Sequence, residues 1–367
     1  MFKRYSAAAS VLIFLIAALS GCQGANYQIN QISYQKFEAD FTNVFDTAST
    51  VVGYARTKDE FDRCSRIIYD RLTDLNRQYD IYNNYPGINN IKTVNDNAGI
   101  APVPVSRDII GLLSYGKDYC GASGGAVNIA LGAVLSIWHD YRTEGINDPD
   151  SARLPPMADL KTADAMTDID DMVIDPQAKT VFLKVKGMSL DVGAIAKGYA
   201  TKLAAIDAQK AGFVSGVLDI GGNIEAIGKP LDGVRDRWGI GIQDPEKPIS
   251  GSDNILDTVY VNDNCVVTSG GYQRFYEVDG TEYNHIIDPA TLMPATRYSA
   301  VTVICKDSGD ADMLSTALYI LPIDEGKELL KKYDADAVWV MRDNSMTATD
   351  GYKAISKKFG GYSAVDK

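Results

Sequence analysis

The sequence predicts an α+β fold, and three of its features lead to this prediction. Residues 59–79 repeat apolar side chains at helical spacing. Short runs rich in valine, isoleucine and threonine, such as residues 180–185 and 338–341, have the composition of strands. Helical and strand-like segments do not alternate regularly, as they would in a protein built from βαβ units. With 367 residues, of which 46% are hydrophobic, the chain can form one large domain or two closely packed ones around a sizeable core.

The expected elements follow in chain order. Residues 37–54 alternate loosely and predict strand structure, and residues 59–79 predict a helix. Its apolar stripe is Phe61, Cys64, Ile67, Ile68, Leu72 and Leu75. We expect loops at 80–107 and 140–160, helices at 109–119, 194–212 and 311–321, strand pairs at 173–185, 217–228 and 268–289, and a late strand at 338–341.

Residues 1–21 have the composition of a signal peptide. Lys3 and Arg4 precede an almost wholly apolar run, and Leu19-Ser20-Gly21-Cys22 follows, as at the cleavage site of a lipoprotein. We therefore expect lipidation of Cys22 and a tether over residues 22–36, in an exported lipoprotein on the outer face of the cytoplasmic membrane or in the periplasm. The alternatives are an ordinary signal peptide or a short transmembrane helix, although the run is shorter than the ~20 residues that a span needs.

The chain is acidic, with a formal net charge of −12, and removal of Lys3 and Arg4 with the signal peptide would make it more negative. This charge, with no basic patch to offset it, excludes a nucleic-acid partner. A phosphorylated ligand would need a metal ion or helix N-termini for its binding.

The cysteines and histidines argue against a zinc site. Cys64, Cys120, Cys265 and Cys305 form no C-x-x-C pair, and the chain has only two histidines, His139 and His285. We expect buried free thiols, although an exported location would permit disulfides.

Two glycine-containing segments are candidate phosphate or ring sites. In LDVGAIAKGYA, residues 190–200, a strand is expected to enter a tight turn and a helix, whose N-terminal N–H groups and Lys197 suit a phosphate. The small residues of SGGAVNIALG, residues 123–132, leave room for a flat ring or a phosphate. The alternatives are a plain strand-turn-helix joint and a glycine-rich turn before a buried helix.

Three further segments carry candidate functional groups. The Gly221-Gly222 pair of LDIGGN allows close approach of a ligand, or simply makes a hairpin. His285 lies at the end of the hairpin closed by Asp279-Gly280 and is either catalytic or structural. Asp312 and Thr316 share a helix face and offer oxygen ligands for Mg²⁺, unless Asp312 only favours the positive end of its helix.

Taken in this order, LDVGAIAKGYA, LDIGGN, TSGGYQRFYEVDG with YNHIIDP, and ADMLSTAL resemble the ApbE-like family of FAD:protein FMN transferases. The matching pieces extend from about residue 45 to residue 321. The resemblance implies a single domain over residues 37–367 with a T-fold-like α+β architecture, in which FAD lies in a cleft between two subregions.

The resemblance also implies roles for individual residues. The implied FAD contacts are Phe45, Tyr82, Ala126, Val127, Asn128, Asp191, Lys197 and Ile287. The implied metal ligands are the backbone carbonyl of Ala194 and the side chains of Asp312 and Thr316, and His285 is the implied proton acceptor. Many relatives have an aspartate in place of Asn128, some have an acidic ligand in place of Ser315, and the loop around Tyr82 is divergent.

The implied activity is Mg²⁺-dependent transfer of FMN from FAD onto a Thr or Ser hydroxyl of an exported or membrane flavoprotein subunit, with AMP as the leaving group. With water in place of the hydroxyl, the same site would act as an FAD pyrophosphatase. The alternatives from other classes are a non-catalytic flavin-binding lipoprotein and a solute-binding lipoprotein of a transporter.

Overall fold

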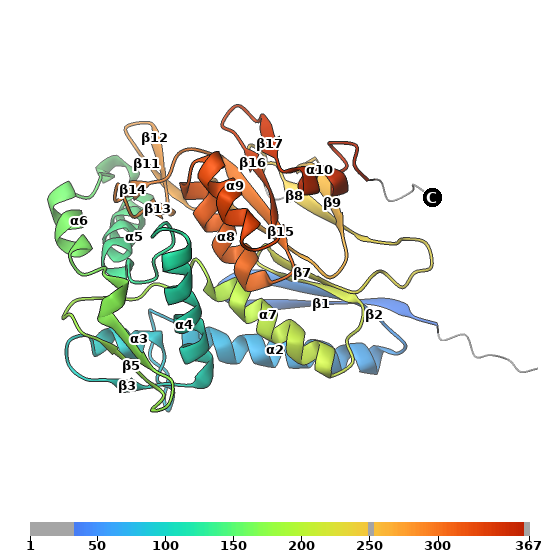
Figure 1. Cartoon of the computed structure of the whole chain (residues 1–367), viewed down its shortest axis with the longest axis horizontal. Helices are drawn as coiled ribbons and strands as arrows, with labels where there is room; N and C mark the ends of the chain where they lie inside the picture. Colours follow the sequence, from blue (N-terminus) through green and yellow to red (C-terminus); the bar gives the residue numbers. More distant parts are fainter. Residues whose placement is uncertain (1–32, 249–252, 363–367) are drawn as a thin grey trace, which may run out of the picture. The chain divides into compact units, whose positions relative to one another are not determined.

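The computed structural model describes residues 33–248 and 253–362. The chain divides into two compact units, Met1–Ser33 and Tyr34–Lys367. The predicted signal peptide, Cys22 and most of the predicted tether lie outside the described residues. All the elements drawn in Figure 1 belong to the second unit. None of the helices in the described part of the chain combines the length and the apolar character that crossing a bilayer requires.

An antiparallel sheet of eight strands, in the order β1-β2-β6-β7-β10-β15-β16-β17, forms the centre of the second unit. The strands are β1 (Gln35–Val44), β2 (Thr47–Ala55), β6 (Gly216–Ile220), β7 (Asn223–Ile227), β10 (Cys265–Gly270), β15 (Ala300–Cys305), β16 (Asp336–Val340) and β17 (Met346–Ala348). The helices that cover one face are α2 (Lys58–Tyr79), α4 (Arg107–Ala122), α7 (Ala196–Lys210), α8 (Ser308–Ile320) and α9 (Ile323–Lys331). The opposite face carries the ribbon β8 (Trp238–Gln243) and β9 (Ile255–Val261) with α10 (Asp350–Ile355).

The sequences of the strands reflect the fact that both faces of the sheet are covered. Val267 and Val303 belong to the large core cluster under the helices, whereas Val266 and Ile304 belong to the cluster under the β8–β9 ribbon. Successive side chains of a strand point to opposite faces of a sheet. Because both faces of the sheet are covered here, all six residues of β15 are buried.

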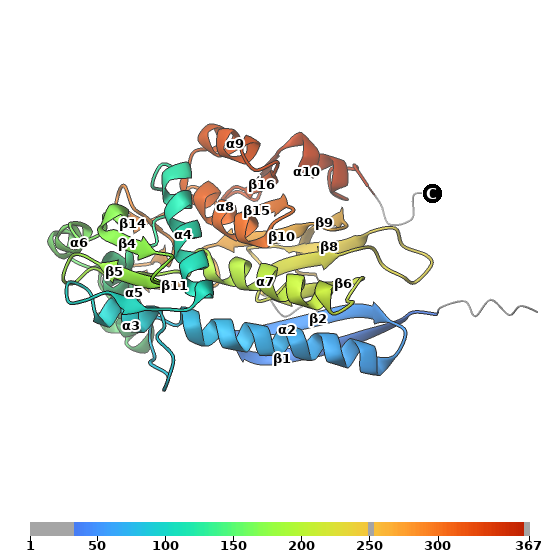
Figure 2. The same cartoon turned by 60° about the horizontal axis from the view of Figure 1, so that its bottom comes forward.

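A second subregion flanks one end of this sheet (Figure 2). It contains α3 (Ile91–Asp96), a small sheet of β3 (Val103–Pro104), β5 (Thr180–Leu183) and β4 (Met172–Asp175), then α5 (Gly132–Asn147), η1 (Pro149–Ser151), α6 (Met157–Asp164) and η2 (Ile169–Asp171). The hairpins β11 (Phe275–Val278) with β12 (Thr281–Asn284) and β13 (Ile287–Asp288) with β14 (Met293–Pro294) complete it. A separate core cluster, which includes Trp138, Leu160 and Tyr276, joins α5, α6 and these hairpins.

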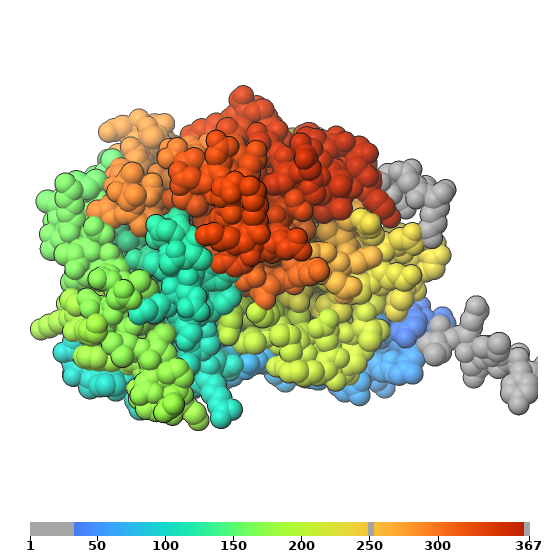
Figure 3. All heavy atoms as spheres, viewed as in Figure 1, coloured from blue at the N-terminus to red at the C-terminus, as the bar shows by residue number. Residues whose placement is uncertain are grey.

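Helix α4 links the second subregion to the C-terminal helices, and Figure 3 shows its surface against that of α8 and α9. The Tyr115 hydroxyl donates a hydrogen bond of 2.7 Å to Asp310 Oδ1. The ring of Tyr119 stacks on Tyr333, with ring centroids 5.2 Å apart. These contacts fix the side of the sheet on which α8, and therefore Asp312, lies.

The predicted fold class is confirmed, and most predicted elements have observed counterparts. Helix α2 begins where Thr57 Oγ1 accepts a hydrogen bond from the Glu60 N–H, and its predicted stripe is buried except for Ile67, which is partly exposed. The four cysteines in the described residues are buried and free, as expected.

Two local predictions were wrong. Residues 140–160 are not a loop: α5 continues to Asn147, and α6 starts at Met157. Helix α5 continues because Gly145 lets it approach the ring of Tyr276, which a Cβ at position 145 would meet at 2.6 Å. Residues 80–107 are loop-rich as expected and contain only the short elements α3 and β3. The strand expected before the turn at Gly193 is reduced to one bridge between Ser189 and Leu131.

Candidate functional site

A cavity of about 490 Å³ lies between the end of the central sheet and the second subregion. Its walls come from the β6–β7 turn, β8, β10, the start of α7, the middle of α5 and of α8, and residues 126–129, 272–274 and 285–287. These segments are far apart in the sequence, so the cavity exists only in the folded chain.

Most of the predicted site residues line this one cavity. They are Tyr82, Ala126, Val127, Asn128, Asp191, Ala194, Lys197, His285, Ile287, Asp312 and Thr316. Phe45 does not line it: its side chain packs against the main core, and its N–H donates to Asn76 Oδ1. Thr47, two residues later, lines the cavity instead.

The segment before α7 is held by side-chain hydrogen bonds in place of the strand that was expected there. Asn95 of α3 both donates to the Leu190 carbonyl and accepts from the Leu190 N–H, at 2.9 and 2.8 Å. Asp191 Oδ1 then accepts from the Gly193 N–H at 2.8 Å and closes the turn. Burial raises the pKa of Asp191, and the nearby His139 and Arg142 oppose that rise. The turn therefore brings Ala194 and Lys197 to the cavity wall.

Asp312 of α8 caps helix α7 from outside. The cap residue of α7, Ile195, has no side chain that can accept a hydrogen bond, so the first N–H groups of the helix need another acceptor. Asp312 Oδ2 accepts from the Gly198 N–H at 2.8 Å. This bond requires a very close approach, because a Cβ at position 198 would lie 2.3 Å from the Ser308 carbonyl oxygen and 2.4 Å from Asp312 Cβ.

Residues with oxygen atoms suited to Mg²⁺ line the cavity together with Asp312. Asp312 Oδ1 has one distant partner, Asn223 Nδ2 at 3.4 Å, and Asn223 Oδ1 is buried without a partner. The Ala194 carbonyl precedes the cap of α7, and among the described residues it accepts no hydrogen bond. Thr316 Oγ1 follows one turn after Asp312 and makes only long contacts, of 3.3 Å with Ser269 Oγ and 3.4 Å with the Asp312 carbonyl. A carboxylate, a hydroxyl and a free carbonyl are a donor set that fits Mg²⁺.

Ser315 lies beside this set but is already engaged. Its hydroxyl contacts Ser269 Oγ at 2.7 Å and donates to the Asp312 carbonyl at 2.8 Å. Burial raises the pKa of Asp312, and Lys197 and the Gly198 hydrogen bond counteract this. A buried carboxylate of this kind gains from a bound cation, because the cation replaces the water that burial has removed.

Lys197 connects α7 to the turn between β6 and β7. Its Nζ lies 3.4 Å from the Gly221 carbonyl oxygen. Gly221 and Gly222 have φ angles of 56° and 86°, the left-handed conformation that a two-residue hairpin turn requires. Asp219 Oδ1 accepts from the Gly222 N–H at 2.9 Å; burial raises its pKa, and Lys197 lowers it. Lys197 is therefore the cation that interacts with both acidic side chains on this side of the cavity, Asp219 and Asp312.

The wall at residues 126–128 presents small side chains and backbone. Asn128 is occupied by the protein itself, because its Nδ2 donates to the Thr167 carbonyl at 2.9 Å and its Oδ1 accepts from the Ala130 N–H at 2.9 Å. The Val127 N–H donates to Ser123 Oγ at 3.1 Å. These hydrogen bonds hold the loop in its conformation. Asn128 therefore stabilises the wall of the cavity through contacts within the protein.

His285 follows directly after β12 and faces the cavity. Its Nδ1 lies 3.3 Å from the Arg274 carbonyl oxygen, a hydrogen bond that exists when Nδ1 carries the proton. The lone pair of the neutral ring is then on Nε2. Burial lowers the pKa of His285 to about 4, with smaller contributions from Arg274 and Arg142. At neutral pH the ring is therefore an uncharged proton acceptor.

Sequence reasoning missed three residues that line the cavity near His285. They are His139 and Arg142 on α5, whose second half was predicted to be a loop from residue 140, and Arg274 in the loop before β11. Arg142 Nη2 contacts His139 Nδ1 at 3.1 Å, and the His139 ring centroid is 5.5 Å from that of Tyr82. The spacing of His139 and Arg142 on one helix face is the only signal that the sequence offered.

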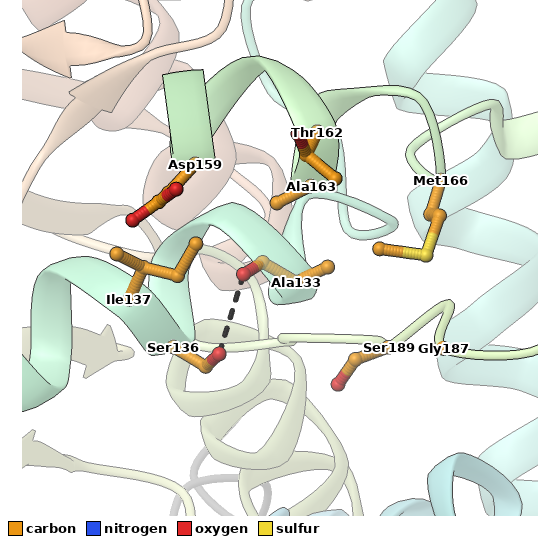
Figure 4. A pocket seen from close by; sticks show the side chains of 9 residues that line it. All are labelled: Ala133, Ser136, Ile137, Asp159, Thr162, Ala163, Met166, Gly187 and Ser189. Atoms are coloured by element: carbon orange, nitrogen blue, oxygen red, sulfur yellow. Dashed lines mark hydrogen bonds between the residues drawn. The ribbon is translucent and has the colours of Figure 1, made fainter. Parts of the chain in front are cut away.

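A second hollow of about 390 Å³ lies between α5, α6 and the segment before α7 (Figure 4). Its one ionisable side chain is Asp159. The hydroxyl of Ser136 donates to the Ala133 carbonyl of its own helix at 3.2 Å. No group there is arranged for proton transfer or for metal binding, so the larger cavity is the candidate active site.

Comparison with known proteins places this geometry in a family. The family model described as the ApbE family matches residues 45–339. An FAD:protein FMN transferase of Treponema pallidum (strain Nichols) is 36% identical over 278 residues, which are 71% of this chain and 73% of the relative. One of Klebsiella pneumoniae (strain 342) is 30% identical over 279 residues, which are 75% of this chain and 83% of the relative.

Solved structures agree on the fold. The ApbE protein of Thermotoga maritima MSB8 has a TM-score of 0.75 at 24% identity and covers 88% of this chain and 99% of its own. The apo form of the Pseudomonas stutzeri flavinyl transferase ApbE has a TM-score of 0.71 at 25% identity and covers 90% and 98%. The predicted family resemblance and architecture are both confirmed.

Proposed function

The chain belongs to the ApbE family, and we propose that it is an FAD:protein FMN transferase, which moves FMN from FAD onto a Thr or Ser hydroxyl of an acceptor protein and releases AMP. One observation carries the proposal beyond the names of the relatives. The folded chain brings a neutral histidine, a lysine at a helix N-terminus and a set of hard oxygen ligands to one cavity.

FAD would bind with its pyrophosphate near the start of α7. Lys197 Nζ and the positive end of the α7 dipole favour phosphate oxygens at this position. The aromatic ring of Tyr82 and the apolar side chains of Val127 and Ile287 line the remaining cavity and suit the flat rings of FAD. Asn128 acts indirectly here, because its side chain holds the loop that carries Val127.

Asp312, Thr316 and the Ala194 carbonyl would hold Mg²⁺, which when bound neutralises pyrophosphate charge and stabilises the departing phosphate. The protein's part is to position these three oxygens and keep Asp312 ionised. Lys197 favours the ionised form of Asp312, and so does the Gly198 N–H. Because the chain is acidic overall, a cation at this point would also allow a doubly negative ligand to enter.

His285 would take the proton from the acceptor hydroxyl. The hydroxyl oxygen then bonds to the FMN phosphorus, the pyrophosphate P–O bond breaks, and AMP leaves with the electron pair of that bond. The base is weak in the empty cavity, with a pKa of about 4. The two negative charges of a bound pyrophosphate would raise this pKa, so the base strengthens when FAD is in place.

We further propose that the protein works outside the cytoplasm as a lipoprotein held through Cys22 and that its acceptor is an exported or membrane flavoprotein subunit. The support is the sequence alone, a basic and apolar segment followed by Leu19-Ser20-Gly21-Cys22. Mass spectrometry of the protein purified from membranes would detect a lipidated N-terminal cysteine. An unprocessed N-terminus would refute this part of the proposal.

The activity is tested by incubating the full chain with FAD and Mg²⁺, with and without EDTA, and measuring release of AMP and FMN. Candidate exported flavoprotein domains are then added, and their intact mass is measured for the gain of one FMN. Metal-dependent AMP release with labelled acceptor establishes the transferase. AMP release with free FMN and no labelling of any acceptor makes the protein a pyrophosphatase, and FAD binding without AMP release leaves a flavin-binding protein.

A further inference from the structure

Two side chains of α5 that line the cavity are joined by a hydrogen bond, and this bond decides which nitrogen of a histidine carries the proton. Arg142 Nη2 lies 3.1 Å from His139 Nδ1. A guanidinium group can only donate, so Nδ1 accepts, and the proton of the ring is on Nε2. Nε2 has no hydrogen-bond partner among the described residues, and His139 is only half-buried in the cavity wall. His139 therefore offers a free N–H donor to a ligand in the cavity.

This donor lies beside an exposed aromatic ring. The ring centroids of His139 and Tyr82 are 5.5 Å apart, and the two ring planes are inclined by 36°. Tyr82 is 59% exposed although it lines the cavity, so part of its ring has no protein cover. An open aromatic ring beside a hydrogen-bond donor suits a flat heterocycle, which can stack on the ring and accept a hydrogen bond from the donor.

Side-chain hydrogen bonds hold the loop that carries Tyr82. Asp80 Oδ1 accepts from the N–H groups of Tyr82 and Asn83, at 2.6 and 3.0 Å. Asp80 Oδ2 accepts from the Tyr85 hydroxyl at 2.7 Å, and Asn90 Nδ2 donates to the Asn83 carbonyl at 2.7 Å. The exposed ring therefore belongs to a braced loop, and a ligand that covers the ring gains the free energy of burying apolar surface.

The two halves of FAD have different requirements for their place in the cavity. The proposed reaction leaves FMN attached to a protein, so the flavin needs an open end from which the acceptor can carry it away. Tyr82 lies at such an end, whereas Ile242 and Val266 line the cavity where it is enclosed by β8 and β10. AMP leaves as a free small molecule and can occupy the enclosed end. The isoalloxazine ring also has carbonyl oxygens that accept from an N–H donor, and adenine has none.

We propose that His139 is a further FAD-binding residue, whose Nε2–H donates a hydrogen bond to an acceptor atom of the isoalloxazine ring stacked on Tyr82. Arg142 is the positioning residue that keeps the proton on Nε2. This inference rests on the proposed function, which makes FAD the ligand. It assigns the flavin half of FAD to the end of the cavity formed by α5 and residues 80–85.

The tautomer is tested by ¹H–¹⁵N correlation NMR of the full chain labelled with ¹⁵N at histidine, at a pH where both rings are uncharged. The chain has two histidines, and His139→Phe assigns their signals. We expect the proton of His139 on Nε2 and that of His285 on Nδ1, which is the opposite tautomer. Arg142→Met should leave a mixture of both tautomers at His139, and saturation with FMN should shift the Nε2 signal of the parent protein. An Nδ1–H tautomer of His139 in the parent, or an Nε2 signal that FMN does not move, overturns the proposal.

The binding is tested with FMN and AMP, the two halves of FAD, by isothermal titration calorimetry in the presence of Mg²⁺. His139→Phe keeps a ring beside Tyr82 but removes the donor, so it should weaken FMN binding about 10-fold and leave AMP binding unchanged. Arg142→Met should weaken FMN binding by a smaller factor, because only part of the His139 population then loses the proton from Nε2. The matched control is Asp140→Asn, since Asp140 is the next residue of α5, is exposed and does not line the cavity. It should bind FMN and AMP as the parent does.

Three binding results would contradict the proposal. Weaker AMP binding with unchanged FMN binding in His139→Phe would place adenine at this end of the cavity. Equal weakening of both ligands would show a general disturbance of the cavity, and no change in either would show that His139 contacts neither half. Failure of the proposed function is a separate result, in which the tautomer and FMN binding depend on His139 and Arg142 as expected but the parent protein releases no AMP from FAD.

Discussion

The contact between helices α7 and α8 at Gly198 allows a sharp prediction. Replacing Gly198 by alanine would place a Cβ 2.3 Å from the Ser308 carbonyl oxygen and 2.4 Å from Asp312 Cβ. The helices would have to separate by about 1 Å to reach ordinary van der Waals distances. The 2.8 Å bond from the Gly198 N–H to Asp312 Oδ2 would then be broken or greatly lengthened.

The expected loss of stability follows from three contributions. Overpacking costs about 1–3 kcal/mol, and loss of a hydrogen bond to a charged group costs about 1.5–3 kcal/mol. The better helix propensity of alanine returns about 1 kcal/mol. We therefore expect Gly198→Ala to be about 1.5–5 kcal/mol less stable than the parent protein, as measured by urea denaturation. AMP release should fall as well, because Asp312 moves relative to Ala194.

Gly121 provides a matched control. It is also a helical glycine, in α4, but an added Cβ there meets nothing within 4 Å. Gly121→Ala should leave AMP release unchanged and stabilise the protein by up to about 1 kcal/mol. If Gly198→Ala is as stable and as active as the parent, the close approach of the two helices does not position Asp312, and the reasoning is wrong.

Three further predictions test the metal set, the pH dependence and the C-terminal segment. Asp312→Asn should lower Mg²⁺-dependent AMP release by more than about 100-fold, since even outer-shell partners of a metal are worth 10–100-fold; a Mg²⁺ titration that matches the parent would contradict this. Burial raises the pKa of Glu225 to about 8, so the folded chain keeps a proton that the unfolded chain loses above pH ~4.5. The free energy of unfolding should therefore fall as pH rises from about 5 to 8, by up to about 1.4 kcal/mol per pH unit, and should stay constant above pH ~8. Urea titrations at several pH values should show that Glu225→Gln flattens this decline. An unchanged dependence of the unfolding free energy on pH in this variant would refute the assignment to Glu225. The Asp257 carboxylate accepts hydrogen bonds from Tyr352 Oη at 2.9 Å, from Ser356 Oγ at 2.5 Å and from the Lys358 N–H at 2.9 Å. Asp257→Asn should therefore destabilise the protein by about 2–4 kcal/mol in thermal unfolding and make the end of the chain accessible to protease. The exposed Asp343→Asn is the control, and equal effects of the two substitutions would show that burial is not the cause.

Local patterns in the sequence were sufficient for the elements that depend on near neighbours. The stripe from Phe61 to Leu75 predicted α2, and Gly221-Gly222 and Asp279-Gly280 predicted hairpins that are present as expected. Most of the site residues implied by the motif resemblance also line the cavity, because each motif is continuous in sequence. Phe45 is the exception. It lies at a bend of the chain, where a shift of two positions separates a side chain that faces the core from one that faces the cavity.

Long-range contacts decided the elements that the sequence pattern missed. The polar second half of α5 reads as a loop, yet it is helical because Gly145 packs against Tyr276 from a distant hairpin. Residues 189–192 have the composition of a strand, but the only partner available is Leu131, so a single bridge forms. Asn95 supplies the hydrogen bonds that a neighbouring strand would have made.

The sequence by itself determined the fold class, the family and the chemical types of the site residues, because these depend on composition and on short continuous motifs. Only the tertiary structure decided how those groups act on one another. Asp312 became the cap of α7 through a contact across 114 positions of the chain, and Arg142 came to line the same cavity as His285 through the folding of α5 against the β11–β12 hairpin. Electrostatic interactions depend on distance in space and on burial, and neither quantity is written in the order of the residues.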